Sequence, residues 1–200
     1  LIGLVGSEMC IRDRNCKEKK PSRLLFYKGE IAMSFQEINV REFSMKPFKM
    51  IGDQWMLVTA GDQIKYNTMT ASWGGIGVMW GKNVAVTVIR PQRYTKEFVE
   101  SHDCFTLSFY PEEYKKALSL CGSKSGREID KAEETGLIPV FDQAAPYFEQ
   151  ASLVLVCKKL YAQPMDPAGF VDKALDSRWY PDKDYHKMFV GEVIKVLVKE

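Results

Sequence analysis

The residues best suited to hold a small molecule begin with the segment 67–75, which reads NTMTASWGG. It combines small and hydroxyl side chains with two glycines. A flat heteroaromatic ring with carbonyl groups and ring nitrogens needs backbone N–H groups at close approach and small side chains beneath it, and serine and glycine permit that approach. The same residues also fit a polar strand that ends in a turn. Composition alone leaves both interpretations open.

Two other segments are rich in cations and hydrogen-bond donors. Residues 90–95 (RPQRYT) follow an apolar run and precede a predicted helix, and residues 123–127 (SKSGR) precede another. Cations and donors that converge at a helix N-terminus are typical of anion sites, phosphate sites among them. Each segment by itself is more often a solvated loop. Two such segments, both at predicted helix starts, make a phosphate site as good an interpretation as two solvated loops.

A third candidate is His186, in the segment 185–193 (YHKMFVGEV) ahead of a predicted strand. An imidazole there could donate a hydrogen bond near a reacting ring. The alternative is an ordinary surface or core histidine. The chain has two histidines and five cysteines, with no CxxC pair. We therefore expect no metal site, and the odd number of cysteines favours a reducing, cytoplasmic compartment over a disulfide framework.

The composition, with 46% hydrophobic and 27% charged residues, is that of an ordinary globular protein. No apolar run reaches the ~18 residues of a membrane span, so we expect no membrane segment. Residues 1–32 hold seven Lys or Arg and four Asp or Glu, which accounts for the slight excess of positive charge in the chain. We expect no nucleic-acid partner on this basis. Residues 1–32 are polar for most of their length and show no periodicity. We therefore interpret them as a non-native or disordered extension, followed by one domain at 33–200.

Short runs of β-branched and apolar residues predict a fold dominated by strands. The run 104–109 alternates like a strand with one buried face. Thr95 is predicted to cap a helix, a second helix begins near Pro111 and stops at Gly122, and a third spans 127–134 and ends at Gly136. Neither a βα alternation nor a GxGxxG motif is present, so a barrel with helices on its rim fits best. The predicted strands are 55–60, 84–89, 104–109, 153–156 and 193–198.

In their order and spacing, the segments NTMTASWGG, RPQRYT, KSGREIDK and HKMFVGEV resemble the flavin reductase-like and flavoredoxin family of FMN-binding split barrels. The resemblance covers most of residues 50–198. It implies a mainly β fold with peripheral helices, a split β-barrel. It also implies a homodimer that builds its flavin pocket at the interface. Many relatives have an aspartate before the histidine, where this chain has Tyr185.

The resemblance also implies roles for individual residues. The strand at 67–73 would run along the flavin ring, and the segment 90–95 would bind the phosphate. His186 would lie on the side of the ring where a nicotinamide approaches. The implied ring contacts are Asn67, Thr68, Met69, Thr70, Ala71, Ser72 and Trp73. The implied phosphate contacts are Arg90, Gln92, Arg93 and Thr95, supported by Lys124, Ser125 and Arg127.

The implied function is that of an FMN-binding oxidoreductase that takes hydride from NAD(P)H and passes electrons to free flavin, a monooxygenase or another redox protein. An alternative is a flavoredoxin-like electron carrier with tightly bound FMN and no nicotinamide turnover. A pyridoxamine-phosphate-oxidase-like barrel would need a further basic pocket, which the sequence does not supply. A non-catalytic flavin or haem module is the remaining alternative, and two histidines make haem the weakest of these.

Overall fold

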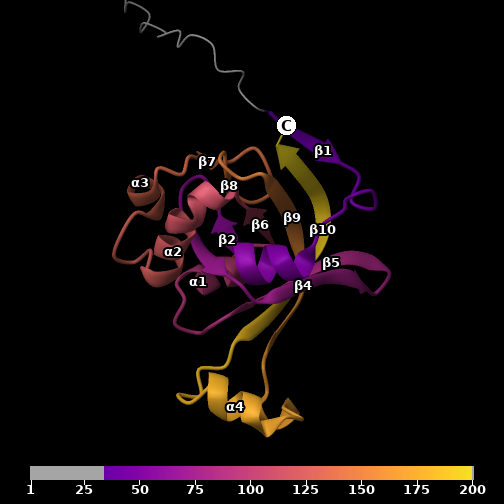
Figure 1. Ribbon diagram of the computed structural model, residues 1–200, viewed down its shortest axis with the longest axis vertical. Coiled ribbons are helices and arrows are strands. Elements are labelled where there is room, and N and C mark those ends of the chain that lie inside the picture. Colours follow the sequence, from indigo (N-terminus) through magenta and orange to yellow (C-terminus); the bar gives the residue numbers. More distant parts are fainter. Residues whose placement is uncertain (1–33, 200) are drawn as a thin grey trace, which may run out of the picture. The chain divides into compact units, whose positions relative to one another are not determined.

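The computed structural model describes residues 34–199 (Figure 1). The predicted extension at 1–32 lies outside the described residues. Within them, eight strands form one antiparallel sheet in the order β3-β2-β6-β9-β10-β5-β4, with β1 paired to β10, and β7 and β8 form a small second sheet. The strands are β1 (Phe35–Ile38), β2 (Met56–Gly61), β3 (Tyr66–Ala71), β4 (Gly74–Met79), β5 (Lys82–Ile89), β6 (Cys104–Phe109), β7 (Pro139–Val140), β8 (Tyr147–Phe148), β9 (Leu153–Pro164) and β10 (Lys187–Lys199).

The strand β6 lies in the middle of this sheet, between β2 and β9. Its residues Phe105 to Phe109 are all buried. The prediction of one buried face is therefore wrong. Alternation of apolar and polar residues does not distinguish the two cases here, because the hydroxyl side chains on the second face are buried too. The hydroxyl of Thr106, for example, donates to the carbonyl of Pro146 at 2.5 Å.

Helices pack beside the sheet, and Figure 1 shows α1 and α2 on the same side of it. The prediction of a mainly β architecture with peripheral helices is thus confirmed. The helices are a π-helix (Phe48–Gln54), α1 (Thr95–Ser101), a 3-10 turn (Glu112–Tyr114), α2 (Lys115–Ser123), α3 (Lys131–Thr135), a second 3-10 turn (Pro167–Gly169) and α4 (Lys173–Trp179).

Three predicted helix boundaries are wrong by one to four residues. Thr95 is the first residue of α1 and not its cap, because its hydroxyl accepts a hydrogen bond from the Asn67 amide at 2.8 Å. Gly122 lies inside α2, which ends one residue later. The third helix begins at Lys131 and not at residue 127. The carboxylate of Asp130 accepts from the N–H groups of the next turn and fixes that start.

The chain between β9 and β10, residues 165–186, forms an arm that carries α4. Figure 1 shows it extending from the ends of these two long strands. Asp172 begins α4 by accepting the N–H of Ala174 at 2.9 Å. The arm ends at His186, directly before β10. Its connection to two paired strands gives it a fixed attachment at both ends.

Candidate functional site

The first cavity, which we call the ring cavity, has a volume of about 360 Å³. The end of β3, the end of β5 and the arm converge on it. Small side chains from β3 form one wall, as expected for a pocket that admits a flat ring. Its lining residues are Met69, Thr70, Ala71, Ser72, Trp73, Val88, Arg90, Arg93, Trp179 and His186.

Two tryptophans from distant parts of the chain meet at the ring cavity. Trp73, just after β3, packs edge-to-face against Trp179 of the arm, with ring centroids 5.0 Å apart. Trp73 also lies 5.0 Å from the imidazole of His186, centroid to centroid. Aromatic pairs at such distances are stabilising and exclude water from what they cover. The sequence did not single out Trp179, because a tryptophan in a polar helix gives no indication of its partner.

His186 is buried, with 9% of its surface exposed. Its Nδ1 lies 2.8 Å from the hydroxyl of Tyr180. Burial lowers the pKa of His186 to about 4, the nearby Arg90 and Arg93 contribute in the same direction, and Asp184 opposes them. The imidazole is therefore neutral at physiological pH.

Arg90 holds the arm against the end of β5. Its guanidinium pairs with the carboxylate of Asp184 and donates to the carbonyl of Trp179 at 2.8 Å. Gln92 donates to the same carboxylate at 2.8 Å, and these hydrogen bonds lower the pKa of Asp184. Arg90 and Gln92, two of the four predicted phosphate contacts, thus bind an acidic side chain of this chain. An acidic residue does stand near the histidine, two positions before it.

A second cavity, which we call the cation cavity, has a volume of about 220 Å³. It shares Met69 and Arg93 with the ring cavity, so the two adjoin. Three cations line it, and none of its described lining residues is acidic. Its lining residues are Met69, Gln92, Arg93, Tyr94, Thr95, Ser123, Lys124, Ser125, Gly126 and Lys131.

Lys131 is the functional candidate that the sequence prediction missed. It is 6% exposed, and its Nζ donates to the carbonyls of Thr68 and Cys121, both at 2.7 Å. Burial lowers its pKa to about 8. The residue was hidden within a helix predicted to begin at 127. Asp130, followed three residues later by Glu133, has the spacing of a capping box and would have placed Lys131 at the helix start, beside the loop.

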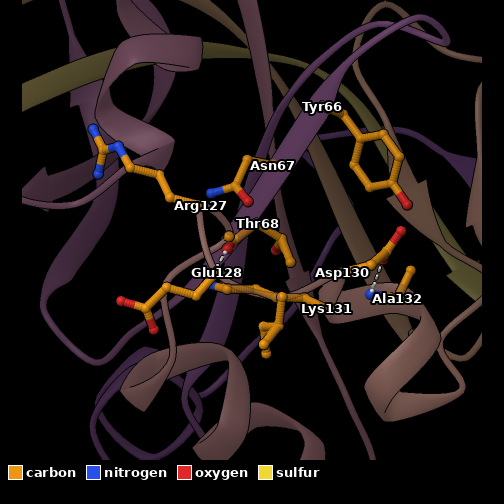
Figure 2. Close-up of a pocket in the computed structure, with 10 residues that line it drawn as sticks. Tyr66, Asn67, Thr68, Arg127, Glu128, Asp130, Lys131 and Ala132 are labelled. Carbon is orange, nitrogen blue, oxygen red and sulfur yellow. Dashed lines mark hydrogen bonds between the residues drawn. The ribbon is translucent and has the colours of Figure 1, made fainter.

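A third cavity, the mixed-charge cavity, has a volume of about 300 Å³ (Figure 2). It shares Gly126 and Lys131 with the cation cavity. Figure 2 shows the hydroxyl of Tyr66 directed toward the carboxylate of Asp130, with Arg127 on the other side of Asn67. Arg127 pairs with Glu97 outside this cavity. The lining residues are Tyr66, Asn67, Thr68, Gly126, Arg127, Glu128, Ile129, Asp130, Lys131 and Ala132.

The structure divides the predicted site residues among these cavities. Asn67, Thr68 and Arg127 lie in the mixed-charge cavity and in neither of the other two. The hydroxyl of Thr68 is 2.8 Å from that of Thr59 on β2, which explains why it does not reach the ring cavity. The ring cavity receives Met69, Thr70, Ala71, Ser72, Trp73, Arg90, Arg93 and His186. The cation cavity receives Gln92, Arg93, Thr95, Lys124 and Ser125.

Comparison with protein families decides the classification, because the model of the Flavin reductase like domain matches residues 49–200. The chain belongs to this family. The predicted resemblance is confirmed. The sequence matches none of the curated proteins with which it was compared.

Three solved structures show the same fold as this flavin reductase-like chain. The FMN-binding domain of a flavin reductases-like enzyme from Shewanella baltica OS155 has a TM-score of 0.60 at 18% identity, over 84% of this chain and 79% of that one. Flavoredoxin of Desulfovibrio vulgaris (Miyazaki F) has a TM-score of 0.57 at 23% identity, over 73% and 69%. A split barrel domain from Shewanella frigidimarina NCIMB 400 has a TM-score of 0.58 at 18% identity, over 72% and 66%. The predicted split barrel is confirmed.

No helix at 34–199 is long and apolar enough to cross a membrane. The same residues contain no group of three or more His, Cys, Asp or Glu side chains placed to hold a metal ion. Within this part of the flavin reductase-like chain, Cys104, Cys121 and Cys157 are free thiols.

Proposed function

We propose that this chain binds FMN, with the ring in the ring cavity and the phosphate in the cation cavity, and that it is an NAD(P)H-dependent flavin reductase. One observation carries the proposal: a cavity lined by three cations and, among the described residues, no acid adjoins a cavity with small side chains and an aromatic wall. A phosphomonoester joined to a flat ring matches this division of charge. Family membership supports the activity.

The cation cavity fits a phosphate because its charges are not neutralised by carboxylates. Among the ion pairs of residues 34–199, none involves Arg93, Lys124 or Lys131. Arg93 donates to the carbonyl of Gly122, which leaves further guanidinium donors. Ser125 and the backbone beside Gly126 add polar groups at the same place. A charged hydrogen bond to phosphate contributes roughly 1.5–3 kcal/mol.

The ring cavity fits an isoalloxazine because β3 ends there. Ala71 and Ser72 are small, and the strand terminates at Ala71, which frees the following backbone groups from the sheet. Met69 joins the two cavities and provides a polarisable contact for an aromatic ring. Bound FMN would supply the redox chemistry, accepting two electrons from a nicotinamide nucleotide. The chain would bind and orient the ring, and Trp73 with Trp179 would exclude water from it.

The test is the visible spectrum of the purified full-length protein before and after anaerobic addition of NADH or NADPH. We expect a bound-flavin spectrum that one nucleotide bleaches within seconds. His186→Ala should retain the flavin spectrum and slow the bleaching about tenfold, the cost of losing roughly 1.4 kcal/mol of positioning. The matched control is His102→Ala, which removes the other histidine from outside all three cavities. Absence of bound flavin would refute the proposal.

A flavoredoxin-like electron carrier is the second candidate. The observation that favours it is the Trp73–Trp179 pair, which covers part of the cavity that a nicotinamide would have to enter. In that case flavin stays bound, neither nucleotide bleaches it, and a chemical or protein reductant does. Free flavin, a monooxygenase or another redox protein would be the acceptor in either case.

We also propose a homodimer, and a cytoplasmic location in keeping with the free thiols. Support for the dimer comes from Phe48, which is 94% exposed beside Trp73 in an apolar cavity of about 460 Å³. An aromatic side chain exposed to that degree favours burial against a partner. Sedimentation equilibrium should give twice the chain mass. A stable monomer that retains FMN at micromolar concentration would refute the dimer.

A further inference from the structure

Tyr180, which no prediction singled out, contacts His186 from within the arm. It directly follows α4 and is 3% exposed. Its ring meets the imidazole edge-on, with centroids 5.5 Å apart and planes at 81°. Its hydroxyl oxygen lies 2.8 Å from Nδ1 of His186. The geometry is that of a buried hydrogen bond between two side chains whose rings cannot turn freely.

The direction of this hydrogen bond depends on which acceptor takes the hydroxyl hydrogen. A tyrosine hydroxyl has one hydrogen, and two acceptors compete for it here: Nδ1 of His186 at 2.8 Å and the thioether sulfur of Met165 at 3.4 Å. A thioether is a weak acceptor, whereas an unprotonated imidazole nitrogen is a strong one. A hydroxyl that donates to Nδ1, the stronger of the two acceptors, leaves the single proton of a neutral imidazole on Nε2.

Burial is the main reason that both partners are uncharged, and for His186 the surrounding charges add to it. The charged groups that face His186 are Arg90 and Arg93 from the loop after β5 and Asp184 from the arm. With burial, the arginines lower the pKa of His186 to about 4. Burial raises the pKa of Tyr180, so the phenol keeps its hydrogen. From pH 5 to 8 both rings are therefore uncharged, a phenol beside a neutral imidazole.

We propose that Tyr180 is a positioning residue that fixes His186 as a neutral Nε2–H donor to the ring cavity. The role of this donor toward a ligand rests on the proposed function, whereas the tautomer of His186 does not. Within residues 34–199, no hydrogen bond uses Nε2 of His186, whereas Nδ1 is engaged. A donor with a fixed tautomer can hold a carbonyl oxygen, such as that of a nicotinamide carboxamide. It does not release a proton, so His186 orients a ligand and is not a general acid.

Nuclear magnetic resonance of the full-length protein labelled with ¹⁵N-histidine tests the tautomer directly. The chain has two histidines, and His102→Gln assigns the spectrum. In the wild type we expect the proton of His186 on Nε2 and no titration of the ring between pH 5 and 8. In Tyr180→Phe we expect a mixture of tautomers. A wild-type proton on Nδ1, or the same tautomer in both proteins, would overturn the proposal, whether or not the variant is fully stable.

The reduction rate provides the functional readout. Tyr180→Phe should leave FMN affinity within about twofold and slow NAD(P)H-dependent reduction about three- to tenfold, the usual weight of one hydrogen bond. The wild-type rate should not vary with His186 ionisation between pH 5 and 8. The matched control is Tyr185→Phe, because the Tyr185 hydroxyl donates to Asp176 at 2.7 Å while its ring packs on Tyr180. If Tyr185→Phe slows reduction equally, the effect comes from arm packing and the proposal is wrong.

The two proposals fail separately. If neither nucleotide reduces bound flavin, the reductase function is refuted, and the NMR measurement still decides whether Tyr180 sets the tautomer. If reduction is normal but the proton lies on Nδ1, the reductase function stands and the role of Tyr180 is refuted.

Discussion

The cation cavity and the mixed-charge cavity share part of one stretch of chain, yet they differ in the charges that they present to a ligand. They share Gly126 and Lys131. The first has three cations and no described acid, while the second includes Glu128 and Asp130 (Figure 2). Arg127 illustrates the difference, because its guanidinium pairs with Glu97. The number of cations in a segment therefore says less about anion binding than which of them lack an acidic partner.

Of the substitutions considered for these two cavities, removal of Arg93 should have the largest effect on FMN affinity. Arg93 lines both the ring and the cation cavity. We expect Arg93→Ala to weaken FMN binding about ten- to hundredfold and riboflavin binding much less, because only FMN carries the phosphate. Fluorescence titration with both ligands measures this. Equal losses for the two ligands would mean that Arg93 supports the fold through its bond to Gly122.

Gly126 lies against Asn67 of β3. A Cβ atom there would lie 1.9 Å from the side-chain oxygen of Asn67, whose amide group donates to Thr95. Gly126→Ala should break that buried hydrogen bond and cost about 1–3 kcal/mol in free energy of unfolding. Denaturant titration measures it. The control is Gly169→Ala, since a Cβ at Gly169 meets no atom within 4 Å. Similar values for both variants would show that the close approach has no energetic weight.

Lys131 should make FMN binding in the cation cavity depend on pH. Its pKa is lowered to about 8, and a bound phosphate favours the charged form. FMN affinity should therefore fall between pH 8 and 9, by up to about tenfold, while riboflavin affinity should not. Folding stability without ligand should respond in the opposite direction. The unfolded chain keeps the proton up to the ordinary value of 10.5, so this group adds stability as pH rises above 8. Lys131→Met should remove both trends, and their persistence would assign them to another group.

Arg127→Ala should have the smallest effect. Its salt bridge with Glu97 is solvent-exposed, and such pairs contribute about 0–1 kcal/mol. We expect FMN affinity to change by less than about twofold and the melting temperature to change little. A tenfold loss of FMN affinity would instead place Arg127 among the phosphate ligands and remove the distinction between the two cavities.

Runs such as 84–89 were predicted as strands because β-branched residues have few alternatives to one, but 153–156 and 193–198 cover only parts of β9 and β10, and β1 and β4 were not predicted. The sequence predicted the segments of the site, 67–73 and 90–95, but not how the side chains divide among cavities. That division depends on partners distant in sequence. Arg90 is engaged by Asp184, 94 positions away, and Asn67 by Thr95. Trp179, Tyr180 and Lys131 were missed for the same reason, since a side chain's partner is a tertiary property.

The register of β10 determines when this site can exist during synthesis. Strand β10 pairs with three other strands. Its Lys199 lies opposite Phe35 of β1, and other parts of β10 pair with β5 and β9. Until β10 has left the ribosome, β5 lacks one of its two neighbours and His186 has no fixed position beside Trp73. Pairings this distant in sequence form late and slowly. Flavin therefore cannot guide the early folding of a nascent chain. A chain truncated before β10 should emerge without a cofactor and with the edge of β5 unpaired, which favours aggregation.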